Sequence, residues 1–174
     1  MSNALPDRVR PLELARTGTH VEGELTLQGM ERLAPSLARI GEQVQVRLHF
    51  GCDAQNVRYI RGRVTTTLEL ICQRCLEVMP FPVDIAVSLG IIGAAAEAER
   101  LPGAYEPLLL DESEAVSLKT VVEDELLLAL PLVALHDPGE CRATEVLRRL
   151  RPEEGAREGR RPFAGLAELL KAPD

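Results

Sequence analysis

Apolar and polar residues alternate through much of the N-terminal half of the chain, as expected for strands with one buried and one solvent-facing side. The alternation is clearest in residues 43–50, 59–70 and 81–89. The second of these segments is rich in threonine, whose β-branched side chain favours strands. A turn around residues 51–56 joins the first two segments, so they predict an antiparallel hairpin.

Weaker patterns lie between and after these segments. Residues 9–14, 21–27 and 105–110 are shorter strand candidates. Residues 31–38 interrupt the alternation, because apolar residues there recur at helical spacing, and Pro35 suits the first turn of a short helix. Residues 93–102 are rich in alanine and glutamate and predict a loop or a fragment of helix.

The clearest helical pattern covers residues 117–130. Ser117 is a good N-cap residue, and Pro131 ends the helix. The apolar stripe of this helix consists of Leu118, Val121, Val122, Glu125, Leu128 and Ala129. Glu125 is the exception on the stripe, so we expect it to be paired or to lie at the margin. A structural role is the commoner one for such a carboxylate, and we favour it over catalysis.

The last part of the chain has a different composition. Residues 142–162 include seven arginines and predict a solvated, flexible stretch. Residues 162–171 then predict a short helix, whose apolar side can dock on its own domain or in a partner's groove.

The chain of 174 residues is long enough to bury one hydrophobic core. The patterns predict an α+β fold, with an antiparallel sheet or partly open β-barrel over residues 9–110, one main helix and a C-terminal helix. We assign residues 1–141 to a single α+β domain and residues 142–174 to a flexible, arginine-rich tail with a short terminal helix.

No segment is apolar over the length that crossing a bilayer requires, and the N-terminus lacks the features of a signal peptide. These observations predict a cytoplasmic protein with no membrane partner. In that reducing compartment the four cysteines are expected to be thiols or metal ligands rather than disulfides. Aromatic residues are scarce, with no tryptophan, two tyrosines and three phenylalanines, which leaves little material for a base-stacking surface.

The net charge of −7 is unevenly distributed along the chain. Residues 91–140 hold eleven acidic and two basic residues, a net charge of −9, whereas residues 1–90 are neutral overall. The acidic segment repels phosphate, which argues against tight nucleic-acid binding by the whole surface. It is compatible with a protein partner that has a basic face.

The candidate chemistry centres on Cys72, Cys75, His136 and Cys141. A two-residue gap lets one turn direct Cys72 and Cys75 to the same point, and turn-forming residues separate His136 from Cys141. Structural zinc takes four such ligands, so we predict a zinc site. Two alternatives stay open, namely buried structural thiols and, less favoured, a redox pair. Cys52 lies in a separate turn and is expected to be a lone thiol.

A set of motifs recurs in one known family. The motifs are Cys72-Gln73-Arg74-Cys75, residues 104–107, residues 122–132, His136-Asp137 with Cys141, and Pro162-Phe163-Ala164. In order and spacing they resemble the bacterial large ribosomal RNA subunit accumulation proteins, the YceD family, over residues 20–171. The resemblance implies a role in the synthesis, processing or stability of 23S ribosomal RNA, without enzymatic activity. The resemblance implies that Cys72, Cys75 and Cys141 are the family's site residues. His136 is included with them only because it is near Cys141 in the sequence.

The first functional hypothesis is therefore a non-catalytic ribosome-biogenesis factor that binds precursor ribosomal RNA or a ribosome-assembly protein. Its candidate nucleic-acid contacts are Arg58, Arg61, Arg63 and Arg74, together with the arginines of residues 148–161. These arginines are equally well explained as solvated surface positions.

The alternative is an acidic protein-interaction module, in which residues 97–124 bind a basic ribosomal or processing protein and affect ribosomal RNA only indirectly. A hydrolase or nuclease is the weakest hypothesis. The sequence has no Ser-His-Asp arrangement, no glycine-rich phosphate loop and no His-Glu-x-x-His motif. His49 lies in an alternating strand and is expected to be structural.

Overall fold

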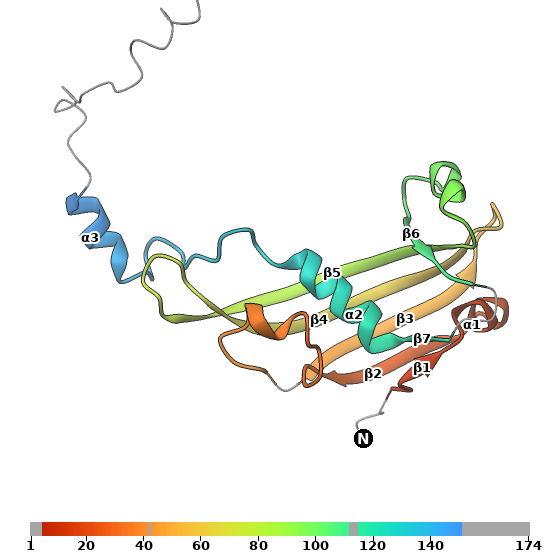
Figure 1. Ribbon diagram of the computed structural model, residues 1–174, viewed down its shortest axis with the longest axis horizontal. Helices are drawn as coiled ribbons and strands as arrows, with labels where there is room; N and C mark the ends of the chain where they lie inside the picture. The colour runs from red at the N-terminus through yellow and green to blue at the C-terminus, as the bar shows by residue number, and fades with distance from the viewer. Residues whose placement is uncertain (1–4, 42, 112–114, 151–174) are drawn as a thin grey trace, which may run out of the picture. The chain divides into compact units, whose positions relative to one another are not determined.

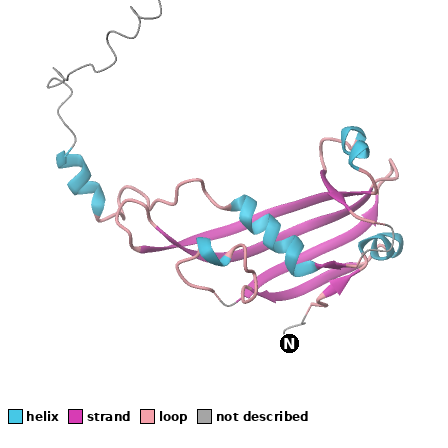
Figure 2. Cartoon of the chain, in the orientation of Figure 1, coloured by secondary structure: helices cyan, strands magenta, loops and turns pink. Residues whose placement is uncertain are grey.

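The computed structural model describes residues 5–41, 43–111 and 115–150. The chain forms two compact units, which divide between His136 and Asp137. The first unit contains a five-stranded sheet with a helix across one face, and a separate pair of short strands (Figures 1 and 2). The predicted α+β class with a mainly antiparallel sheet is confirmed.

The large sheet has its strands in the order β2-β3-β4-β5-β6. The bounds of these strands are His20–Thr26, Gln43–Cys52, Arg58–Ile71, Val78–Ile92 and Glu106–Leu109. Neighbouring strands are antiparallel, except that β6 runs parallel to β5. Because β2 and β6 are edge strands, the sheet is open and does not close into a barrel.

The alternating residues of the strands form an aliphatic core. The core side of β3 and β4 consists of Val44, Val46, Leu48, Phe50, Ile60, Val64 and Leu68, all of which are buried. Between them in sequence lie exposed polar residues such as Arg47 and Arg63. The predicted hairpin is confirmed, and its register pairs Cys52 with Arg58.

Helix α2, Leu118–Ala129, packs on the core side of the sheet (Figure 1). Ser117 caps it as predicted, since its hydroxyl accepts a hydrogen bond from the N–H of Thr120 at 3.3 Å. The buried side differs from the predicted stripe, because Glu123 is buried and Leu128 is 74% exposed. The stripe is therefore rotated around the helix relative to the prediction.

The N-terminal segment also differs from its prediction, and the strand expected at residues 9–14 is wrong. Strand β1, Arg8–Val9, pairs instead with β7, Val116–Ser117, and is followed by helix α1, Pro11–Thr17. Proline suits the first position of a helix because its missing N–H would have no partner there. Gly18 ends the helix in the left-handed conformation, with φ of 62°.

Among the described residues, two short 3-10 helices lie in the connections between strands. The helix predicted at residues 31–38 is limited to η1, Ala34–Ser36. The second, η2, Ala95–Arg100, lies in the segment predicted as a loop or helix fragment.

The described part of the second unit, residues 137–150, ends in helix α3, Ala143–Leu150. Glu145 forms ion pairs with Arg148 and Arg149 at 2.9 and 3.2 Å, one helical turn away. The sequence prediction contains no helix at this position, and the predicted terminal helix at residues 162–171 lies outside the described residues. Within the described ranges, no helix has the length and apolar character needed to cross a membrane.

Candidate metal centre

The turn between β4 and β5 carries Cys72 and Cys75. Two backbone hydrogen bonds close it, from the N–H of Cys72 to the carbonyl of Glu77 at 2.9 Å and from the N–H of Leu76 to the carbonyl of Cys72 at 2.8 Å. Leu76 adopts a left-handed φ of 61°, a costly conformation for leucine that the turn imposes. Cys72 is buried and Cys75 is half-buried. We term residues 72–77 the thiol turn.

The segment that follows α2 runs beside the thiol turn and supplies His136. The N–H of Gln73 donates to the carbonyl of Ala134 at 2.9 Å. The Nδ1 atom of His136 lies 3.3 Å from the Sγ of Cys75, and its backbone N–H donates to the Sγ of Cys72 at 3.4 Å. The first unit therefore brings together two thiols and one imidazole from distant parts of the sequence.

The surroundings of Cys72 favour its thiolate form. Burial alone would raise the pKa of this thiol. Hydrogen bonds from the backbone N–H groups of Cys75, His136 and Arg74, and from the His136 side chain, outweigh burial and lower the pKa to about 5. The thiolate is therefore the main form at neutral pH, and it is the form that binds a metal ion.

Cys141 is the remaining predicted ligand. It is buried, and its N–H donates to the carbonyl of Asp137 at 3.1 Å. The ligand atoms of Cys72, Cys75, His136 and Cys141 all lie within 4.8 Å of one another. Three thiols and one imidazole are a donor set of structural zinc sites. This Cys3His cluster is compatible with a metal ion.

Cys52 does not belong to the Cys3His cluster. It is exposed at the end of β3, and its Sγ lies 3.4 Å from the amide oxygen of Asn56. It therefore serves as a matched control for experiments on the other cysteines.

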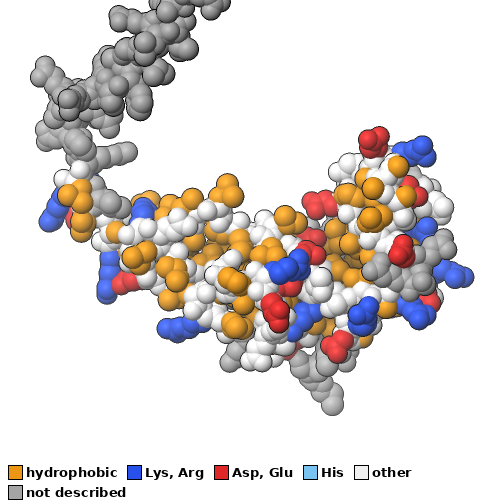
Figure 3. Space-filling model, viewed as in Figure 1, with side chains coloured by type: hydrophobic (Ala, Val, Ile, Leu, Met, Phe, Trp, Pro, Cys, Tyr) orange, Lys and Arg blue, Asp and Glu red, His pale blue; other side chains and the backbone are white. Residues whose placement is uncertain are grey.

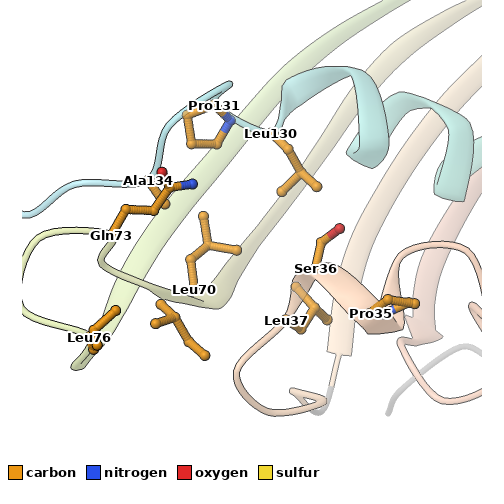
Figure 4. A pocket seen from close by; sticks show the side chains of 10 residues that line it. Pro35, Ser36, Leu37, Leu70, Gln73, Leu76, Leu130, Pro131 and Ala134 are labelled. Atoms are coloured by element: carbon orange, nitrogen blue, oxygen red, sulfur yellow. The ribbon is translucent and has the colours of Figure 1, made fainter.

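A groove of about 370 Å³ lies beside the thiol turn (Figure 4). Its sides come from three segments, residues 35–37, 70–76 and 130–134. Figure 4 shows one leucine from each segment around it, namely Leu37, Leu70 and Leu130. No pattern in the sequence predicts this groove, because it depends on three segments meeting in space.

Four of the arginines predicted to contact RNA do not form one group. They are Arg58, Arg61, Arg63 and Arg74, of which the first three lie on β4 and the last in the thiol turn at the other end of that strand. Arg63 makes a two-point ion pair with Asp84, with one contact at 2.7 Å. The guanidinium of Arg74 donates to the carbonyl of His136. RNA contact by these residues stays a prediction.

A row of aromatic rings lies at the end of the sheet where Arg61 is located. The rings of His20 and His49 stack with centroids 4.1 Å apart, and Tyr59 meets the edge of His49 at 5.6 Å. Arg61 lies over the rings of Tyr59 and Tyr105, 4.8 and 4.5 Å from their centroids. Composition did not predict this row. The signal that could have found it is the pairing of His20 with His49 across β2 and β3.

The open sheet, the covering helix and the Cys3His cluster define a small α+β protein with a thiol-rich candidate metal centre. The family model for the large ribosomal RNA subunit accumulation protein YceD matches residues 60–170, which include all four residues of the cluster. The large ribosomal RNA subunit accumulation protein YceD of Haemophilus influenzae is 35% identical to the chain over 167 residues, 95% of each protein. The chain therefore belongs to the YceD family, as the resemblance predicted. No solved structure matches it.

Proposed function

We propose that this protein supports the accumulation of the large ribosomal RNA subunit, by promoting the synthesis, processing or stability of 23S ribosomal RNA. The observation that carries the proposal is membership of the YceD family, with similarity over 95% of a relative of that name. The partner is precursor ribosomal RNA or a ribosome-assembly protein.

We propose further that the protein acts without catalysing a reaction. Glu123, the buried charged side chain among the described residues, accepts hydrogen bonds from the backbone N–H groups of Arg32 and Leu33. His20 and His49 stack on each other. These contacts support structural roles for the residue types that general acid–base catalysis uses.

The Cys3His cluster is assigned a structural zinc ion. Four protein ligands fill a tetrahedral zinc, whereas catalytic sites keep one position for water or substrate. A bound ion would fix the thiol turn to the chain that follows α2, adding to the hydrogen bond between Gln73 and Ala134. Elemental analysis of untagged protein purified without chelator should find about one zinc per chain, and Cys72→Ser should lower that content while Cys52→Ser should not.

Depletion of the protein in its own cells, followed by measurement of the ratio of 23S to 16S ribosomal RNA, tests the proposed function. The expected result is a selective deficit of 23S RNA with accumulation of its precursors. The wild-type and Cys52→Ser proteins should restore the ratio, whereas Cys72→Ser should restore it less well. An unchanged ratio on depletion would overturn the proposed function.

A further inference from the structure

A second groove, remote from the thiol turn in the sequence, lies between α2 and strands β5 and β6. It encloses about 380 Å³. Apolar side chains from all three elements line it, namely Leu89, Leu108 and Val121. The groove also has three carboxylates, and we term it the carboxylate groove.

The three carboxylates are Glu106 on β6 and Asp124 and Glu125 on α2. Asp124 is paired with Arg32, at 2.5 Å. Within the described part of the chain, Glu106 and Glu125 form no ion pair, and the groove lining contains no arginine, lysine or histidine. The groove therefore carries negative charge that the described residues do not neutralise.

The grouping of these carboxylates disfavours the charged form of Glu125. Its side chain is half-buried, and burial raises the pKa of its carboxyl. The charges of Glu106 and Asp124 raise the pKa further. The sequence predicts that Glu125 is paired or lies at the margin of its stripe, and the structure places it at the margin. A cation in the groove would relieve the repulsion among these carboxylates.

Exposed leucines accompany the charge. Leu128, which lines the groove, is 74% exposed, and Leu108 in the same lining is half-buried. Figure 3 shows Asp and Glu side chains next to apolar surface over α2 and β6. Single exposed leucines are common, but leucines beside a groove with an apolar floor and acidic rim offer two complementary kinds of contact.

We propose that the carboxylate groove is a docking site for a basic amphipathic segment of a protein partner. Apolar side chains of that segment would pack on Leu108, Val121 and Leu128, and its lysines or arginines would face Glu106 and Glu125. Protein is favoured over RNA because the groove carboxylates repel phosphate. The inference goes beyond the proposed function. The groove contains Glu106 and Asp124 of the acidic segment predicted at residues 97–124, and adds Glu125 just beyond it.

The test measures binding of a synthetic peptide of leucine and lysine, with leucine on one face of a helix, to the purified full-length protein by isothermal titration calorimetry. The double variant Glu106→Gln with Glu125→Gln should weaken binding about tenfold. Leu128→Ser should weaken it as well. The control is Glu97→Gln with Glu99→Gln, which removes the same charge from η2 and should change binding less than about twofold. A cooperative thermal unfolding transition would show that each variant is folded.

Two outcomes would overturn the inference. In one, the groove and η2 variants weaken binding equally, which would show attraction to the overall negative charge alone. In the other, a single-stranded oligouridylate titrated directly into the wild-type protein binds it and Leu128→Ser abolishes that binding, which would identify nucleic acid as the occupant. Raising the salt concentration should weaken the peptide complex without abolishing it, because the leucines retain their apolar contacts. These measurements use no ribosomal RNA readout, so their failure and that of the proposed function are distinguishable.

Discussion

The Cys3His cluster and the carboxylate groove both gather polar side chains from distant parts of the sequence, but they differ in what those side chains meet. At the cluster, backbone N–H groups and an imidazole face the sulfur of Cys72. At the groove, Glu125 faces the like charges of Glu106 and Asp124. The chain thus supplies favourable partners at one site and repulsion at the other. A polar cluster with its own donors stabilises the fold, whereas one without a counter-charge is suited to an external ligand.

The largest expected effect comes from removing a ligand of the cluster. Cys72→Ser should lower the midpoint of thermal unfolding by about 10 °C, because it removes a ligand of the proposed zinc ion, which would join the thiol turn to the segment after α2. Circular dichroism of metal-loaded protein would measure it. A chelator should lower the wild-type midpoint toward that of the variant.

Cys52→Ser is the control for this prediction, because Cys52 is an exposed thiol outside the cluster. It should shift the midpoint by less than about 2 °C. Equal shifts for the two variants would show that the cluster contributes no more to stability than an exposed thiol does, and the contrast with the groove would fail.

The second effect concerns a carboxylate of α2 that does have partners. Burial would raise the pKa of Glu123, but the N–H groups of Leu33 and Arg32 and the Arg32 guanidinium outweigh it and hold the pKa below its usual value. Glu123→Gln should therefore cost about 2 kcal/mol of unfolding free energy at neutral pH, measured by urea unfolding.

The pH dependence of this cost has a definite sign. A carboxyl group with a lowered pKa adds stability above its unfolded-state pKa and loses it as the pH falls through the folded-state pKa. The difference between wild type and Glu123→Gln should thus shrink below about pH 4. Asp124→Asn is the control, since Asp124 and Arg32 are both half-exposed and solvent screens their ion pair, so this variant should cost less than Glu123→Gln. A cost independent of pH would contradict the role of the Glu123 charge.

Local signals account for the parts of the fold that the sequence predicts well. The hairpin of β3 and β4 follows from alternation, and the start and end of α2 follow from Ser117 and Pro131. The grouping of Cys72 and Cys75 follows from their two-residue gap within one turn. Each of these features depends on neighbours within a few positions, where sequence patterns carry most information. The same kind of signal, Pro11 with Gly18, was present for α1, and the strand prediction overlooked it.

Contacts between distant segments account for the rest. Glu123 is buried because the chain at Arg32 and Leu33 offers it two N–H donors, which no helical periodicity could reveal. The ion pair of Arg63 depends on β5, which places Asp84 beside it. The carboxylate groove depends on β6 pairing in parallel with β5. The candidate metal site was therefore easier to predict than the candidate docking site, because its residues have a recognisable chemistry and spacing.

The smallest expected effect tests whether the groove is destabilising for the free protein. Burial and two neighbouring carboxylates raise the pKa of Glu125, so ionisation of this group opposes folding. A raised pKa gives stability that is present below the unfolded-state pKa and is lost as the pH rises through the folded-state pKa. Glu125→Gln should therefore raise the midpoint of thermal unfolding by about 2 °C at neutral pH and by nothing measurable below about pH 4.

This pH dependence is opposite in sign to that of Glu123→Gln, although the two residues are two positions apart on one helix. Glu99→Gln is the matched control, because Glu99 is exposed on η2, and it should leave the midpoint unchanged at both pH values. If Glu125→Gln instead destabilises the free protein at neutral pH, its carboxylate already has a favourable partner. The groove would then resemble the Cys3His cluster in serving the fold, and the argument for an external cationic ligand would lose its electrostatic basis.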